Sequence, residues 1–413
     1  MACLTLSTSA QDVGAGDASI RTHETVPDDL AERRERLHNY LASRRARLDI
    51  VATTKTDSGQ VIDWILRDTQ GHSGHVASPP ALERMVDEGD EAVSFELTEQ
   101  LRARGPAGTV PVLRRDVDEV LNGRLPVGID DFLSKYGHAA DRCSPFDGLN
   151  SGLEQPGTSD HEYVFTDQAR VNFGGHGNIN VWDPYVYKSG EFSLGQVAVA
   201  RSANGSAMQT IEAGWQDYKN LYGDNVPHLF VYFTTNAYAS QGDNVGGYNM
   251  DVDGFVQYSS TAFPGMKLES ISSIGGVQHS IHIRVQLHAG NWWIRAGKEW
   301  VGYYPAKLFS ANGLRNKADR ISWFGEVVDM DDGVNSYTDM GSGQFASMGW
   351  RFAAYMRNVR VYDFSDKFSH EYDPDTTWES DPGCYSLDDH SLSGTNWGSF
   401  FWFGGPGKNS GCK

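Results

Sequence analysis

Two glutamates stand in short apolar segments that contain glycine, and their residue type and setting could support catalysis. Glu212 lies in the segment Thr-Ile-Glu-Ala-Gly-Trp, and Glu326 lies in Trp-Phe-Gly-Glu-Val-Val. Burial raises the pKa of a carboxyl group, and two carboxyls that lie close together do not both ionise easily. Such a pair can serve as general acid and general base. A single glutamate in a strand more often faces solvent, so the surrounding sequence has to decide.

The composition bounds the fold and the partners. The chain has 413 residues with 45 Gly, 11 Trp, 18 Tyr and 19 Phe, which favours an all-β domain. The formal net charge of −19 argues against nucleic acid as a partner, because phosphate binding needs a basic surface. No stretch approaches the ~20 apolar residues of a membrane span, so no membrane partner is expected. The first ten residues lack the basic and apolar regions of a signal peptide.

The elements that must position the glutamates follow a clear order. Residues 1–25 are expected to be a disordered leader, and residues 26–140 an N-terminal domain that contains a helix with a leucine face and an arginine face. Residues 141–159 are dense in turn residues and predict a linker. Residues 160–413 alternate short β-branched and aromatic runs with turns, which predicts an antiparallel β-sandwich. The expected strands are 178–182, 195–200, 229–234, 254–258, 280–287, 292–296 and 359–363.

The cysteines and histidines offer little metal chemistry. No Cys-x-x-Cys pair is present, so neither a zinc site nor another cofactor is expected. Cys384 and Cys412 enclose a C-terminal segment that a disulfide would stabilise, although two free thiols remain the alternative. Three histidines cluster around one expected strand, but the first two point to opposite faces, which is poor ligand geometry: His279, His282 and His288.

Many short blocks, in order, resemble the neprosin family of glutamic peptidases. They are residues 180–184, 192–196, 210–215, 221–224, 290–293, 301–305, 324–328, 340–343 and 402–407 with Cys384 and Cys412, and, further upstream, residues 60–63 and 108–111 with Arg114 and Arg115. The resemblance covers roughly residues 57–413. It implies a secreted proenzyme in which a smaller mixed α/β activation domain precedes a β-sandwich catalytic domain. It also implies acid-active cleavage after proline, and it places the two catalytic glutamates on Glu212 and Glu326.

The chain departs from the plant members of this family at one point. Those members have a cysteine pair around the segment Tyr-Asn-Met-Asp at residues 248–251. Gly247 and Asp253 stand in the corresponding places here, so that small disulfide is absent. We expect this to affect stability and pH range more than the chemistry.

A two-carboxyl mechanism assigns further roles. One ionised glutamate would activate a directly attacking water, and the other would protonate the leaving nitrogen. We expect Glu212 as base and Glu326 as acid, with the reverse left open. Gln196 and Tyr232 are candidates for the donor to the oxyanion. A slot for proline needs aromatic walls, for which the candidates are Trp215, Trp292 and Tyr304, although such residues are more often core.

We expect the N-terminal residues to keep the chain inactive as a zymogen. The N-terminal residues would act as an intramolecular inhibitor held by arginine–carboxylate pairs, and Pro145 or Pro156 in the linker would be the point of self-cleavage. We expect a secreted monomer that acts on proline-containing peptides or proteins. A glycoside hydrolase with a carboxylate pair, or a carbohydrate-binding β-sandwich without peptidase activity, is the alternative.

Overall fold

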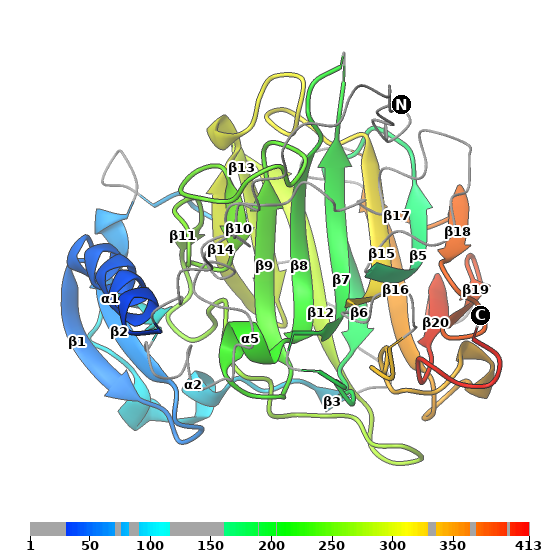
Figure 1. Ribbon diagram of the computed structural model, residues 1–413. Helices are drawn as coiled ribbons and strands as arrows, with labels where there is room; N and C mark the ends of the chain where they lie inside the picture. The colour runs from blue at the N-terminus through cyan, green and yellow to red at the C-terminus, as the bar shows by residue number, and fades with distance from the viewer. Residues whose placement is uncertain are drawn as a thin grey trace, which may run out of the picture.

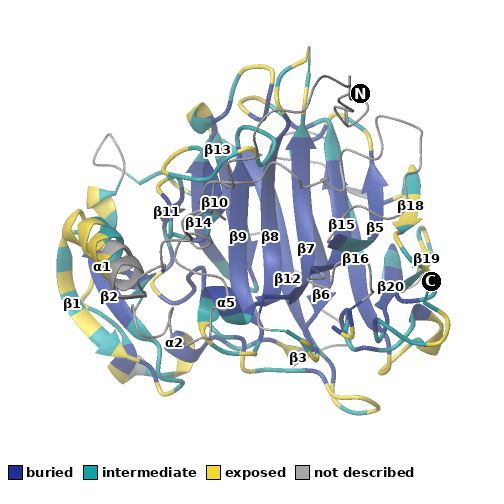
Figure 2. Ribbon diagram, in the orientation of Figure 1, coloured by how far each residue is buried: buried dark blue, intermediate teal, exposed yellow. Residues whose placement is uncertain are grey.

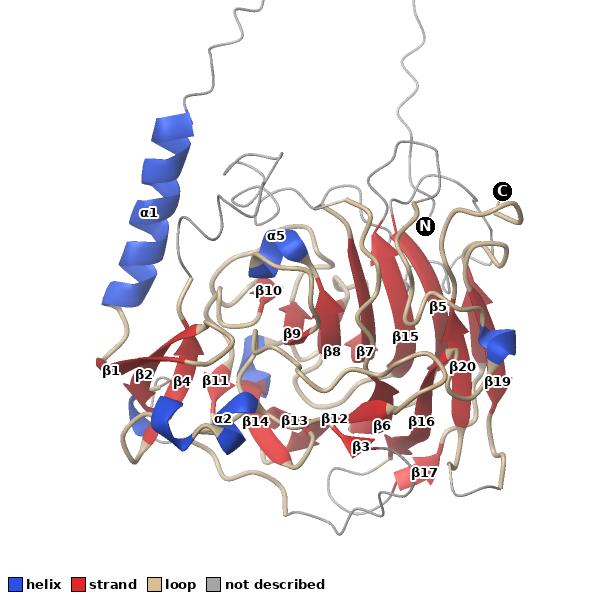
Figure 3. Cartoon of the chain, turned by 90° about the horizontal axis from the view of Figure 1, so that it is seen from below, coloured by secondary structure: helices blue, strands red, loops and turns tan. Residues whose placement is uncertain are grey.

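The computed structural model describes residues 30–70, 76–81, 91–115, 161–188, 190–203, 205–328, 336–363, 369–394 and 397–412. Two large sheets form the body of the molecule and lie face to face (Figures 1 and 3). Every strand pairing within them is antiparallel except that of β3 with β12. The predicted all-β fold with an antiparallel sandwich is therefore confirmed. No described helix is long and apolar enough to cross a membrane.

The first sheet has seven strands. Its order is β10 (Gly246–Tyr248), β9 (His228–Thr234), β8 (Gln209–Asp217), β7 (Phe192–Arg201), β15 (Arg320–Val328), β5 (His161–Gln168) and β18 (Thr376–Glu379). The long central strands β9, β8, β7 and β15 are buried along almost their whole length (Figure 2).

The second sheet packs behind the first. Its main path is β11 (Val256–Gln257), β14 (Glu299–Pro305), β13 (Asn291–Ala296), β12 (His279–His288), β6 (Gly174–Asn180), β16 (Ala354–Tyr362), β20 (Phe400–Gly404) and β19 (Ser386–His390). Two short strands join at the side, where β17 (Ser369–Glu371) pairs with β16 and β3 (Glu91–Ala92) pairs with β12. The seven strand regions expected from the sequence all fall on strands of these two sheets.

The helices are few. The described ones are α1 (Leu30–Ala46), α2 (Glu96–Glu99) and α5 (Lys219–Tyr222), with single 3₁₀ turns η1 (Arg67–Thr69), η2 (Leu101–Ala103), η4 (Ala306–Leu308) and η5 (Ala346–Met348). Helix α1 confirms the helix expected from the leucine spacing. It lies beside a separate three-stranded sheet of β1 (Ile50–Lys55), β2 (Val61–Leu66) and β4 (Thr109–Leu113), at one end of the sandwich (Figure 3).

The N-terminal elements are attached to the sandwich by core packing and by charge. Trp64 of β2 and Phe95 belong to the same apolar cluster as the core between the two large sheets. On the surface, Arg44 of α1 donates to Asp243 at 2.6 Å, and Arg115 contacts both carboxylate oxygens of Asp251 at 3.0 and 2.8 Å. The expected docking of basic residues on an acidic part of the same chain is therefore present. The leader 1–25 and the linker 141–159 lie outside the described residues.

Candidate active site

Strand alternation places the two glutamates on the same face of the seven-stranded sheet. Successive side chains of a strand point to opposite faces. In β8, Ile211, Ala213 and Trp215 enter the core between the sheets, so Glu212 faces outward. In β15, Trp323 and Val327 enter that core, so Glu326 faces outward as well. Figure 1 shows β8 and β15 separated by β7 alone.

Gln196 lies between the glutamates on the intervening strand. In the registers of β7 it pairs with Gly214 of β8 and with Phe324 of β15. Glu212 is two residues before the first partner, and Glu326 is two residues after the second. A Cβ at Gly214 would lie 2.0 Å from the carbonyl oxygen of Gly195 and 2.9 Å from the Cβ of Gln196. Glycine at position 214 therefore leaves room for the glutamine side chain.

Glu212 is buried and accepts three hydrogen bonds from neutral donors. Tyr238 and Thr210 each donate a hydroxyl to Oε1 at 2.7 Å, and Gln196 donates Nε2 to Oε2 at 3.1 Å. Burial raises the pKa of Glu212, and the negative charge of Glu326 raises it further, against the lowering effect of the three donors. The two carboxyl groups are thus close enough to influence each other, as an acid–base pair requires.

Glu326 has a different neighbour. Its Oε1 lies 2.5 Å from Nδ1 of His161, the first residue of β5, and both side chains are buried. β5 and β15 are adjacent strands, and His161 pairs with Val328, two residues beyond Glu326 on the same face. One glutamate therefore contacts an imidazole, while the other contacts hydroxyl and amide donors.

The two oxyanion candidates both lie on the glutamates' face. Gln196 has just been placed there, and Tyr232 of β9 pairs in register with Glu212. The Tyr232 ring packs against the ring of Tyr238, with 5.9 Å between centroids. A cluster of aromatic residues surrounds the glutamates on this face: Phe165, Phe192, Tyr218, Phe230, Tyr232 and Phe324, with Tyr163, Tyr238 and Tyr248 against it.

The three aromatic residues expected to bind substrate lie elsewhere. Trp215, Trp292 and Tyr304 are fully buried in the core between the sheets. The indole nitrogens of the tryptophans donate to the carbonyls of Asn180 and Leu314, at 2.9 and 2.7 Å. The sequence interpretation chose large rings near the motifs without following the period of two along each strand. That period assigns Trp215 to the face opposite Glu212, and the aromatic residues on the glutamates' face are those of the outer cluster.

Sequence reasoning also missed His161, Thr210 and Tyr238. Thr210 could have been found, because it precedes Glu212 by two residues on the same strand face. Tyr238 follows β9 in a turn, where its φ of 61° and that of Ala237 at 57° carry the ring back over β8. No sequence pattern indicated that turn. His161 follows the linker, and nothing in its local sequence links it to Glu326.

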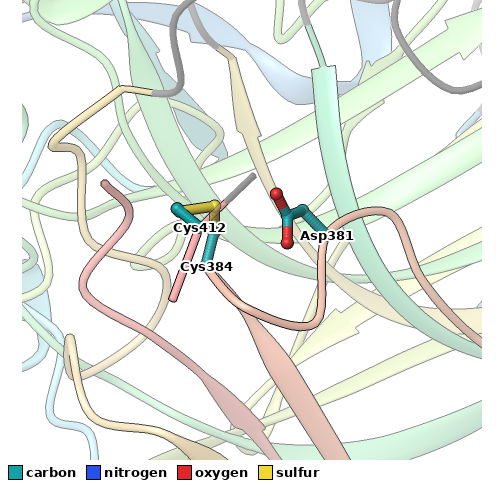
Figure 4. A group of neighbouring side chains, drawn as sticks. All are labelled: Asp381, Cys384 and Cys412. Atoms are coloured by element: carbon teal, nitrogen blue, oxygen red, sulfur yellow. A yellow bond between two sulfur atoms is a disulfide. The ribbon is translucent and has the colours of Figure 1, made fainter. Parts of the chain in front are cut away.

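The C-terminal segment is closed by the expected disulfide. Cys384 and Cys412 are bonded to each other across 28 residues. Asp381 lies beside them (Figure 4), and the three side chains come close enough to resemble a metal-ligand group. The sulfurs are joined, so they are not available as thiolate ligands. Pro145 and Pro156 lie outside the described residues, as do Cys3 and Cys143.

A comparison with known protein families identifies the family of the chain. The sequence profile of the Neprosin family matches residues 189–406, which is more than half of the chain and includes both glutamates. The chain belongs to the Neprosin family. It is therefore a peptidase of the glutamic type, as the resemblance of its motifs implied.

Solved structures give only weak similarities for this Neprosin-family chain. Scytalido-glutamic peptidase with a peptide-based transition-state analogue is 10% identical, with a TM-score of 0.28 over 60% of this chain and 97% of that one. SCP-B of the Eqolisin family, bound to the tripeptide Ala-Ile-His, is also 10% identical, with a TM-score of 0.26 over 59% and 96%. CG-16, a homodimeric agglutinin from chicken liver, is 8% identical, with a TM-score of 0.22 over 40% and 93%. At these TM-scores the similarities carry no argument.

Proposed function

We propose that the chain is an acid-active endopeptidase that cleaves after proline and uses Glu212 and Glu326 as its general acid and base. The observation that carries this proposal is the placement of both carboxyls on one face of the seven-stranded sheet, with Gln196 between them. Their burial and mutual charge favour a state with a single proton on the pair. Membership of the Neprosin family supports the same reaction class.

The pair can hydrolyse an amide without a covalent intermediate. The ionised glutamate accepts a proton from water as the water oxygen attacks the carbonyl carbon. The protonated glutamate then donates to the leaving nitrogen as the C–N bond breaks. Gln196 and Tyr232 are proposed to donate to the developing oxyanion, because both lie on the face where that charge would form. Activity should be bell-shaped in pH, because it requires one proton on the pair.

The aromatic face supports a preference for proline. A pyrrolidine ring is flat and apolar and carries no backbone N–H, so it fits between aromatic side chains. The rings of Tyr163 and Phe324 lie edge to face at 6.1 Å, and those of Phe192 and Tyr218 at 5.3 Å. We propose this cluster, rather than the buried tryptophans, as the origin of substrate preference.

The deciding experiment compares three substrates and two variants. The protein should cut a quenched fluorescent peptide at its single internal proline, spare the same peptide with alanine in place of proline, and release no reducing sugar from polysaccharides. Glu212→Gln and Glu326→Gln should each lower kcat/KM by about a hundred- to ten-thousand-fold, the usual contribution of a general acid or base. Full activity in both variants would sink the proposal, and release of sugar would favour the glycosidase alternative.

We further propose that the protein is made as a secreted, monomeric zymogen in which the N-terminal elements inhibit the enzyme. Arg44 and Arg47 contact Asp243 and Asp253, so protonation of these aspartates would weaken the attachment of α1. Burial raises the pKa of Asp243, but hydrogen bonds and the arginine charge outweigh it and lower the pKa overall. Because the contact with arginine lowers the pKa of Asp243, it contributes stability at neutral pH, and this contribution is lost as the pH falls through that lowered pKa.

Acid incubation tests the zymogen directly. The purified full chain should shorten at acid pH, with a new N-terminus between residues 141 and 159, and activity should rise with the same time course. A chain that stays full-length and is active both in acid and at neutral pH would exclude an inhibitory N-terminal segment. If the purified Glu212→Gln variant is also shortened, another peptidase makes the cut, because this variant lacks one of the two proposed catalytic carboxyls.

A further inference from the structure

His161 occupies a position that neither the sequence motifs nor the family match explains. It lies outside the matched residues 189–406, yet its imidazole touches one of the two glutamates. The contact joins His161 Nδ1 to Glu326 Oε1 at 2.5 Å. Exposed histidine–carboxylate pairs are common and weak, but this pair is buried on both sides, with 8% of His161 and 7% of Glu326 accessible. A buried charge needs a partner, so each group constrains the state of the other.

We propose that His161 is a positioning residue for the peptidase reaction: its protonated imidazole pairs with Glu326 and holds that carboxylate in the ionised form that acts as general base. Glu212 then carries the proton and acts as general acid. This inference rests on the function proposed above. It also reverses the roles expected from the sequence, in which Glu212 was the base.

Two aromatic rings pack against the imidazole of His161 and hold it in place. The ring of Tyr163 stacks on it from the same strand at 5.9 Å, and the ring of Phe192 from β7 meets it edge-on at 5.9 Å. Tyr218 in turn packs edge-on against Phe192 at 5.3 Å. In the part of the chain that the structure describes, these contacts bring the phenols of Tyr163 and Tyr218 near the pair, and the carboxyl of Glu212 lies on the same face of the sheet.

The two glutamates differ in the charge of their partners. The contacts to Glu212 come from hydroxyl and amide groups, which carry no net charge. Glu326 contacts a side chain that is positively charged in acid. An opposite charge at contact distance favours the ionised carboxylate. An ionised Glu326 in turn favours a proton on Glu212, the direction in which burial also moves the pKa of that residue. The asymmetry assigns one role to each glutamate.

The proton balance of the reaction closes with these roles. Glu326 takes one proton from the attacking water, and the remaining hydroxide forms the new C–O bond. Glu212 gives its proton to the nitrogen as the C–N bond breaks, which releases the amine and the new carboxylic acid. Transfer of the proton from Glu326 to Glu212, directly or through water, restores the starting state. His161 keeps its proton throughout.

The pH profile of His161→Asn tests the proposal. Asparagine can place a neutral amide donor near the position of Nδ1, so the variant keeps a hydrogen bond and removes the charge. Without that charge Glu326 should take up a proton at higher pH, and the acid limb of kcat/KM should move up by about one pH unit. Activity below that limb should fall roughly tenfold, with KM nearly unchanged. The matched control is His390→Asn, which removes an imidazole paired with Asp388 on strand β19 and should leave the profile unchanged.

A second measurement covers the case in which the variant folds poorly. The His161 ring can be followed by NMR in the full chain with and without Glu326→Gln, and loss of the carboxylate should lower the pH at which the ring gives up its proton. An unchanged ring titration, or a His161→Asn profile that superimposes on the parent, would overturn the role of His161. Either result would leave the peptidase proposal intact as long as Glu212→Gln and Glu326→Gln are inactive. Activity in those two variants would instead remove the proposed function itself.

Discussion

The two faces of strand β8 each carry a buried carboxyl group, and the two groups have opposite surroundings. Glu212 faces outward and accepts hydrogen bonds from Tyr238, Thr210 and Gln196. Asp217, five residues on, points to the side of Trp215, and neither of its carboxylate oxygens has a hydrogen-bond partner among the described residues. Burial raises the pKa of both, that of Asp217 to about 8.

The comparison teaches that a raised pKa alone does not identify a catalytic group. Asp217 is fully buried, and the charges of Asp183 and Asp224 raise its pKa further. Among the described residues, however, neither of its carboxylate oxygens accepts a hydrogen bond. Glu212 accepts three hydrogen bonds, and β7 and β15 bring Gln196 and Glu326 to its face. The arrangement of groups around each carboxyl, more than the size of its pKa shift, distinguishes the face of Glu212 from the face of Asp217.

On the opposite face of β8, which packs into the core with Trp215, truncation of a side chain should mainly lower the stability of the fold. Trp215→Ala removes a fully buried indole and its hydrogen bond to the Asn180 carbonyl, so we expect a loss of about 3–5 kcal/mol in the free energy of unfolding. Urea denaturation measures it. At temperatures where the variant stays folded, kcat should remain within a few-fold of the parent. A loss of activity without a loss of stability would place Trp215 in the substrate site after all.

The unpartnered carboxyl should make stability depend on pH. The folded state keeps a proton on Asp217 up to pH about 8, whereas the unfolded chain loses it near pH 4. The folded state therefore binds more protons between these values, and its stability falls as the pH rises through that window. Asp217→Asn removes this dependence.

We expect the free energy of unfolding of the Asp217→Asn variant to exceed that of the parent by about 5 kcal/mol at pH 8 and to match it near pH 4, since the pKa of Asp217 rises by about four units on folding. Thermal or urea unfolding at the two pH values measures the difference. Asp388→Asn, at an exposed carboxyl, is the control and should change neither value. Equal stabilisation at both pH values would mean that Asp217 does not hold a proton in the folded state.

On the face of β8 that carries Glu212, the loss of a single hydrogen-bond donor should lower activity rather than stability, and the effect should be smaller than those above. Tyr238→Phe removes the hydroxyl that donates to Glu212 Oε1, and we expect roughly a tenfold loss in kcat/KM, because this hydrogen bond strengthens as Glu212 gives up its proton and becomes charged. That bond lowers the pKa of Glu212, so its loss should move the alkaline limb of the profile to higher pH. Thr210→Val, which removes the other donor to Oε1, should shift the limb in the same direction. A shift toward lower pH in either variant would contradict the proton-donor role of Glu212.

Much of the fold could be predicted because its signals are local. The strands show as β-branched and aromatic runs between turn residues, and the leucine spacing of α1 is visible over a few turns. The sequence also favoured the pairing of Cys384 with Cys412 over two free thiols, and the structure confirms it. The proline-slot candidates Trp215, Trp292 and Tyr304 were chosen by size and proximity to motifs, and the structure buries all three in the core, because burial depends on which face each strand turns inward.

The sequence by itself determined the all-β class and the order of the strands along the chain, because apolar period and turn chemistry act over a few residues. Its motifs resemble the neprosin family, and that resemblance placed the candidate pair on Glu212 and Glu326. Only the tertiary structure decided that Glu212 and Glu326 share one face and that their partners differ. The turn that returns Tyr238 to Glu212 and the pairing of β5 with β15 that brings His161 to Glu326 join residues 26 and 165 positions apart. Such contacts depend on strand order and register, which no local pattern encodes.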